Sequence, residues 1–222
     1  NSLGENHPDV ARDLNNLVLL LQATNRPAEA EPLMRRALKI DEQSLGENHP
    51  EIARNLNNLA QLLKATNRFA EAEPLMRRAL KIDEDSYGKD HPDVAIDLNN
   101  LAQLLQATNR LDEAEPLMRR ALKIDEDSYG KDHPDVARDL VILAVLLIFT
   151  NHLAEAEPLM QRALKIFLQF TSETGHPHPD LQTAVNNYDY LLQAMGHSAE
   201  EIQAALDKLG RRFGVDLAGA GG

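Results

Sequence analysis

Apolar residues recur along the chain with the spacing of amphipathic helices, in a pattern that returns every 42 residues. In the first unit Val10, Leu14 and Val18 are four positions apart, which places them on one face of a helix. A second apolar stripe, residues 30–38, follows after a short turn. Each unit is therefore expected to form a pair of antiparallel helices. A repeat of this length is typical of a solenoid, in which neighbouring units bury their apolar faces against each other.

Short polar motifs mark the ends of these helices. A His-Pro pair opens each of the first four units, and Pro suits the first helical position because it needs no N–H donor there. The His is then expected near the N-cap. An Asn follows each first helix, where the left-handed backbone that ends a helix is needed. The residues are His7, His49, His91 and His133, then Asn25, Asn67, Asn109 and Asn151, with Gly196 in the fifth unit.

The fifth unit departs from the pattern. Three residues are inserted within residues 171–177, and Ser198 with Glu201 forms a capping box for a helix expected to end near Leu209, before Gly210. We interpret this unit as a C-terminal cap. The expected organisation is an array over residues 1–213, followed by a disordered tail at 214–222. The units are about residues 2–43, 44–85, 86–127, 128–173 and 174–213.

The repeated segments Ala53-Arg-Asn-Leu-Asn-Asn-Leu-Ala and Asn67-Arg-Phe-Ala-Glu-Ala-Glu-Pro-Leu-Met resemble tetratricopeptide repeats, of the 42-residue type found in kinesin light chains and similar bacterial arrays. The resemblance covers about residues 2–208. It implies an all-α, right-handed superhelical solenoid of five units with the first helices on its inner surface. Asn67 stands where the family usually has Gly, and Asn can adopt the same backbone conformation.

The resemblance also implies a groove lined by a second face of each first helix. One Asn per unit matches the family's peptide-clamping Asn, whose amide can bond the backbone of an extended peptide. The alternative is that these Asn are solvated or bond to neighbouring side chains. The expected groove residues are Arg12, Asn16, Arg54, Asn58, Gln61, Lys64, Ile96, Asn100, Gln103, Arg138, Ile142, Val145, Phe149 and Asn187, and the clamping Asn are Asn16, Asn58, Asn100 and Asn187.

Basic residues on this face, Arg12, Arg54 and Arg138 with Lys64, are suited to bind acidic side chains or a terminal carboxylate. Kinesin light chain grooves similarly take acidic peptides with an aromatic anchor, so acidic peptides with an aromatic or leucine anchor are the expected partners. The alternative is that the arginines pair within their own helices, for example with Asn16 or Asn58.

The fourth unit is apolar where the others are polar, from Val141 to Phe149. Such a patch has three explanations: a pocket for an apolar anchor of the ligand, a self-association surface, or packing against the altered fifth unit.

Composition and charge reduce the classes of function that the chain can have. The 222 residues carry a formal net charge of -12, which disfavours sequence-independent binding to nucleic acid or anionic membranes. The longest apolar run, residues 140–149, is about half of the roughly 20 residues that cross a bilayer. With no Cys, disulfides and thiolate metal sites are excluded and a cytoplasmic location is expected. Most acidic residues fall in Glu-Ala-Glu or Asp-Glu-Asp runs that we interpret as solvated helix ends.

Catalytic and metal sites are not expected. The junctional His recur one per repeat, too far apart to share an ion, and neither a phosphate loop nor a nucleophile elbow is present. The leading hypothesis is a non-enzymatic module, without cofactor, that binds a peptide or helical segment of a partner protein. Two rivals stay open. One is a structural array that self-associates through its first helix or its fourth unit, and the other is the sensor or scaffold arm of a larger, NTPase-linked protein.

Overall fold

The computed structural model describes residues 7–24 and 26–217, apart from the side chain of Gln22. Within this part of the chain there are ten α-helices and no strand, which confirms the expected all-α architecture. Contacts divide the protein into two compact units, residues 1–110 and 111–222. The first unit holds α1 (Pro8–Ala23), α2 (Pro27–Leu45), α3 (Pro50–Ala65), α4 (Phe69–Tyr87) and α5 (Pro92–Ala107). The second holds α6 (Leu111–Tyr129), α7 (Pro134–Phe149), α8 (Leu153–Thr174), α9 (Leu181–Ala194) and α10 (Ala199–Phe213).

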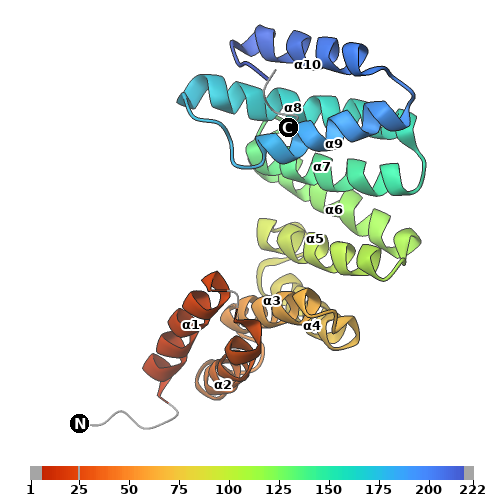
Figure 1. Ribbon diagram of the computed structural model, residues 1–222. Helices are drawn as coiled ribbons and strands as arrows, with labels where there is room; N and C mark the ends of the chain where they lie inside the picture. Colours follow the sequence, from red (N-terminus) through yellow and green to blue (C-terminus); the bar gives the residue numbers. More distant parts are fainter. Residues whose placement is uncertain (1–6, 25, 218–222) are drawn as a thin grey trace. The chain divides into compact units, whose positions relative to one another are not determined.

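In the first unit, helices pack in the order of the sequence. α1 packs on α2 and α3 on α4 as antiparallel hairpins, while α2 also packs on α3 and α4 on α5 (Figure 1). The core between α3 and α4 contains Ile52, Leu56, Ala79 and Ile82, and Leu38 of α2 packs against it. Each second helix thus buries two faces, one against its own partner and one against the next first helix, as a solenoid requires.

The predicted helix ends are confirmed where the structure describes them. The Nδ1 atom of His49 accepts a hydrogen bond from the Glu51 backbone N–H at 3.1 Å, and His91 and His133 cap α5 and α7 in the same way. Asn67 adopts a positive φ of 59°, and the equivalent Asn109 and Asn151 have φ of 60° and 62°. The side chain of Asn can stabilise this left-handed conformation locally. The equivalent prediction for Asn25 lies outside the described residues.

In the second unit, α6 packs on α7, α7 on α8 and α8 on α9, and α10 contacts both α8 and α9. The altered segment of the fifth repeat lengthens α8, which continues to Thr174 and ends at Gly175 in the left-handed conformation. Beyond it, the ring of His178 stacks on Phe167 with 4.5 Å between ring centroids and meets Phe170 edge-on. This His therefore fixes the connection between α8 and α9.

The end of α10 corrects one prediction. The capping box of Ser198 and Glu201 is present, but the helix runs past Gly210 to Phe213, and Gly214 takes the left-handed conformation. Gly210 is needed for a close approach, because a Cβ there would collide with the carbonyl oxygen of Val215. Leu217 of the expected tail is buried with 5% exposure, and the remaining tail residues, 218–222, lie outside the described part.

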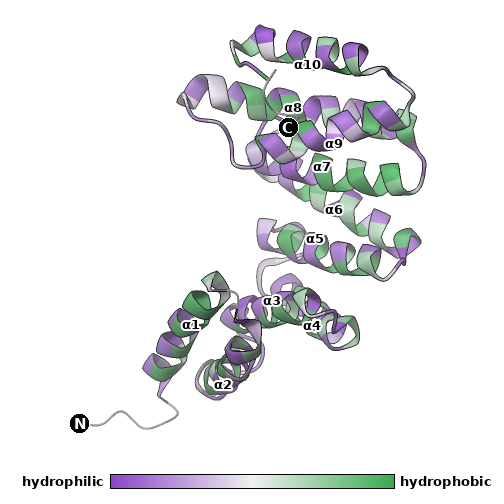
Figure 2. Cartoon of the chain, in the orientation of Figure 1, coloured by the Kyte–Doolittle hydropathy of each residue, from purple (hydrophilic) through white to green (hydrophobic). Residues whose placement is uncertain are grey.

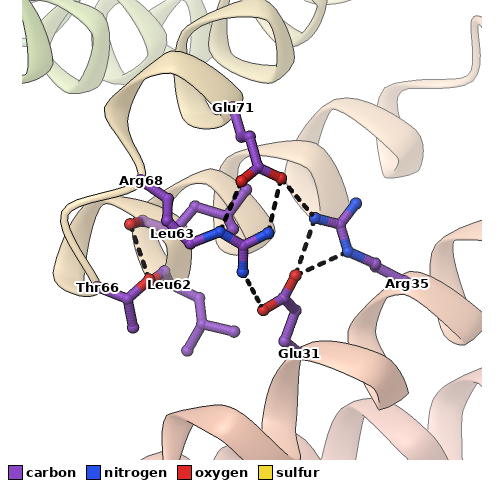
Figure 3. A network of polar contacts seen from close by, with 7 residues as sticks. All are labelled: Glu31, Arg35, Leu62, Leu63, Thr66, Arg68 and Glu71. Carbon is purple, nitrogen blue, oxygen red and sulfur yellow. Dashed lines mark hydrogen bonds and ion pairs between the residues drawn. The ribbon is translucent and has the colours of Figure 1, made fainter.

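Ion pairs join α2 to α4 in a network that the sequence analysis missed (Figure 3). Arg68, directly before α4, donates to Glu31 of α2 at 2.5 Å and to Glu71 at 2.6 Å. Arg35 of α2 bridges the same two carboxylates, at 2.9 Å and 3.4 Å. Although burial alone would raise the pKa of Glu31, the two guanidinium groups hold it below its usual range. The network therefore ties consecutive helix pairs together.

Candidate functional site

Two adjacent clefts lie on the face formed by α1, α3 and α5. The α1–α3 cleft has a volume of about 680 Å³, and the α3–α5 cleft has a volume of about 610 Å³. α3, through Glu51, Arg54 and Asn58, forms a wall of both together with its N-cap residue His49. The second helices close the clefts from below, with Leu45 of α2 in the first and Tyr87 of α4 in the second.

The structure brings together most predicted groove residues of the first unit. Lys64 and Gln103 line neither cleft, but they bond to each other beside it, with Lys64 Nζ donating to Gln103 Oε1 at 3.1 Å. Burial lowers the pKa of Lys64. The α1–α3 cleft contains Arg12, Asn16, Arg54 and Asn58, and the α3–α5 cleft contains Arg54, Asn58, Gln61, Ile96 and Asn100.

The predicted clamping Asn differ in their surroundings. Asn100 accepts a hydrogen bond from Gln61 Nε2 at 2.8 Å, so at this position the neighbour-bonding alternative holds. The side chains of Asn16 and Asn58 are exposed and make no hydrogen bond within the described part of the chain. Their amide groups face the clefts with donors and acceptors that a ligand backbone can use.

Each predicted arginine pairs with a carboxylate one turn earlier in its own helix. Arg12 contacts Asp9 at 3.0 Å, Arg54 contacts Glu51, and Arg138 contacts Asp135 at 2.8 Å. The intrahelical alternative is therefore right in kind but wrong in its partners, since the expected ones were Asn16 and Asn58. Because these exposed guanidinium groups are already balanced, they give no reason to prefer an acidic ligand.

Buried aspartates below the clefts were missed, because the sequence analysis placed Asp-Glu-Asp runs at solvated helix ends. Asp41 of α2 accepts a hydrogen bond from Asn55 Nδ2 of α3 at 2.7 Å. One repeat later, Asp83 of α4 lies close to Asp97 of α5, where burial and then the charge of Asp83 raise the pKa of Asp97. Two ionised carboxylates repel each other and have no donor between them, so we expect this pair to hold one proton.

The pair keeps this proton because burial raises its pKa. Asp97 is 1% exposed, and burial raises its pKa to about 8 despite a hydrogen bond from Asn57. Burial and the nearby charge of Asp93 raise the pKa of Asp83 to about 6. Asp125 and Asp139 repeat the pair between α6 and α7, and burial raises the pKa of Asp125 as well.

In the second unit, the predicted residues lie on α7 and α9. Arg138 reaches Asp180, before α9, at 3.1 Å as well as Asp135. Ile142 and Val145 are half-buried, while Phe149 is 70% exposed. Figure 2 shows α7 as largely hydrophobic. The exposures of its side chains show that this apolar surface is partly covered and partly open. Asn187 of α9 is half-buried and lies apart from the cleft of about 670 Å³ between α9 and α10.

Within the described residues, no helix combines the length and hydrophobicity needed to cross a membrane. The same part of the chain contains no cluster of three or more His, Cys, Asp or Glu that could hold a metal ion.

Comparisons with known proteins agree with this geometry. The family model for the tetratricopeptide repeat matches residues 14–85, 51–127 and 98–169, and the chain belongs to this family. Repeats of this fold typically act as non-catalytic modules for protein–protein interaction or scaffolding. No curated protein sequence matches the chain.

Two solved structures illustrate the likeness. BtubC (BKLC) from P. vanneervenii is 25% identical, with a TM-score of 0.76 over 93% of this chain and 80% of that one. A Podosopora anserina protein described as a kinesin light chain with nearly identical TPR-like repeats is 22% identical, with a TM-score of 0.73 over 94% of this chain and 96% of that one. The predicted resemblance to kinesin-light-chain-type repeats is thereby confirmed.

Proposed function

We propose that the face formed by α1, α3 and α5 binds an extended or helical segment of a partner protein. The observation that carries this proposal is the shared wall of the two clefts. Because Arg54 and Asn58 of α3 line both, one bound segment can cross α3 and place a side chain in each cleft. Such a site recognises a peptide through hydrogen bonds to its backbone and through a few side chains that insert into the clefts.

The two clefts offer different contacts to that segment. Val18, Leu19, Met34 and Leu45 line the α1–α3 cleft and suit a leucine or aromatic anchor. The unbonded amides of Asn16 and Asn58 lie at its rim, where they can bond the ligand backbone. In the second unit, exposed Phe149 is the proposed apolar contact.

A displayed peptide library tests the proposal. Peptides selected on the parent protein are measured again on the double variant Asn58→Ala, Asn100→Ala. We expect binding to fall by roughly tenfold, since one or two hydrogen bonds to the peptide are lost. Gln43→Ala is the control, because Gln43 is exposed on α2 and lines neither cleft. Selected peptides that bind the double variant and the parent equally would rule out the Asn clamp.

Self-association is a second candidate, favoured by the apolar surface of α1. Leu17 and Leu20 are 43% and 60% exposed, whereas Leu59 and Leu62, their equivalents one repeat later, are 1% and 5% exposed. Light scattering of the parent and of Leu17→Gln, Leu20→Gln over a range of concentrations tests it. A mass that rises with concentration in the parent alone would support association through α1, and a constant monomer mass would exclude it.

A further inference from the structure

The two clefts of the first unit are built from equivalent positions but differ in charge. Five lining positions differ between them, and two of these exchanges change the charge: Arg54 and Asn55 of the α1–α3 cleft correspond to Ile96 and Asp97, 42 positions later. The other three replace Leu19, Leu45 and Glu51 by Gln61, Tyr87 and Asp93. The α1–α3 cleft is balanced, with Arg12 and Arg54 against Asp41 and Glu51. The α3–α5 cleft has Arg54 alone against Glu51, Asp83, Asp93 and Asp97. Even with one proton on the Asp83–Asp97 pair, this cleft carries net negative charge.

Asp93 contributes to this charge because its helix lacks the usual basic partner. In α1, α3 and α7, the first acidic residue pairs with an arginine three positions later. In α5, the residue three positions after Asp93 is Ile96. Within the described part of the chain, the one ion-pair partner of the Asp93 carboxylate is the ring of His91, at 3.6 Å. Its charge therefore stays open to the cleft.

Buried acceptor atoms along the same cleft also lack donors. Asp97 Oδ2 and Asp83 Oδ1 are buried, and neither finds an N–H or O–H donor among the described residues. Asn57 Oδ1, on the opposite wall, is also buried and also lacks a donor among the described residues. A proton shared by the two aspartates neutralises one of them and leaves one negative charge at the floor of the cleft. An ammonium or guanidinium group would bring both positive charge and several N–H donors.

The walls suit the aliphatic stem of a basic side chain. Tyr87 is 45% exposed and Ile96 is 56% exposed, and both line the cleft. Burial raises the pKa of Tyr87, and the carboxylates of Asp83, Asp93 and Glu51 raise it further. The negative field thus reaches the ring, against which a cation or its methylene groups can pack.

We infer that the α3–α5 cleft binds a lysine or arginine side chain of the partner segment. The inference deepens the proposed peptide binding and rests on it for its biological meaning. It reverses the acidic preference expected from the sequence. The arginines behind that expectation are paired, whereas Asp83, Asp93 and Asp97 have no arginine or lysine partner within the described part of the chain.

A small probe tests the cleft without requiring a peptide ligand. N-acetyl-lysine methylamide is titrated into the full protein while the Tyr87 ring and Ile96 methyl resonances are followed by NMR. We expect saturable shifts that weaken as salt is added, since the attraction is electrostatic. N-acetyl-norleucine methylamide, which has a similar stem without the charge, should bind at least threefold more weakly. Equal binding of the two probes would overturn the inference.

A substitution that copies the residue found at this position in the first, second and fourth repeats tests the role of charge. Ile96→Arg recreates the Asp-Arg spacing of α1 and α7, so the new guanidinium should pair with Asp93 and repel the probe. We expect lysine affinity to fall at least about tenfold, because a like charge a few ångströms away is strongly unfavourable. Gln43→Arg adds the same charge outside the clefts and should leave the affinity unchanged. Unchanged lysine binding by Ile96→Arg would overturn the inference.

The peptide library separates this inference from the proposed function. Selected peptides that require a basic residue, and that lose this requirement on Ile96→Arg, would support both. Selected peptides without any basic preference would sustain peptide binding and overturn the cationic specificity. Lysine binding in the absence of any peptide hit would sustain the cleft and count against the proposed function.

Discussion

Replacing Asp97 by Asn should stabilise the protein above neutral pH. The proton held by the Asp83–Asp97 pair is bound in the folded state and released in the unfolded chain, because burial raises the folded pKa of Asp97 from 3.8 to about 8. The folded state therefore binds more protons, and the free energy of unfolding falls as the pH rises between these two values. Below the lower value, the contribution is fully present.

The magnitude follows from the size of the shift. Each pKa unit corresponds to about 1.36 kcal/mol, so four units set an upper limit of about 5 kcal/mol for the loss between pH 4 and pH 8. The first repeat shows what Asn would do instead: Asn55 donates to Asp41 at 2.7 Å, and no proton is needed. With Asn at position 97, we expect a gain of at least about 2 kcal/mol at pH 8 and little change near pH 4.

Urea unfolding followed by far-UV circular dichroism at several pH values measures this effect. The slope of unfolding free energy against pH should become shallower in Asp97→Asn, while the Asp125–Asp139 pair keeps its own contribution in the second unit. Asp85→Asn controls for net charge, since Asp85 is exposed on α4 and the first repeat has Gln43 at the equivalent position. If Asp97→Asn kept the parent slope, the shared proton would be refuted.

Three further predictions can be checked by the same unfolding assay. Asn67→Gly should leave stability nearly unchanged, whereas Asn67→Ala should cost about 1 kcal/mol because of the left-handed backbone at φ 59°; equal stability of the two variants would contradict this. Gly210→Ala should cost about 2 kcal/mol, because the added Cβ meets the Val215 carbonyl oxygen. Arg68→Met should lower the urea midpoint more at low salt than at high salt, since it removes the ion pairs to Glu31 and Glu71.

The sequence predicts those features that depend on local chemistry. The helix ends at His49 and Asn67 follow from the hydrogen-bonding capacity and backbone tolerance of single residues, and the helix pairs follow from apolar spacing. The extension of α10 was not predictable in this way. Gly is a residue type that commonly ends helices, but the role of Gly210 depends on how the residues after it fold back.

The site was predictable to a lesser extent. The predicted residues Arg54, Asn58 and Gln61 of α3 do line clefts, because they follow from the same helical period as the core. The partner of Arg54 was visible in the spacing from Glu51 and was missed. The Asp83–Asp97 contact was hidden for a physical reason: these residues are 14 positions apart and meet only because α4 packs on α5. A polar residue within an apolar stripe indicates that such a contact exists, but the sequence does not show which residue is its partner.

The hydrogen bonds from Gln61 to Asn100 and from Lys64 to Gln103 join α3 to α5 across the face that the ligand would cover. Groups that clamp a ligand here are also cross-links between neighbouring helices. A ligand that bonds to them must compete with those cross-links, so occupancy and the spacing of the two helices are coupled. The stiffness of the first unit would then depend on whether a ligand is bound.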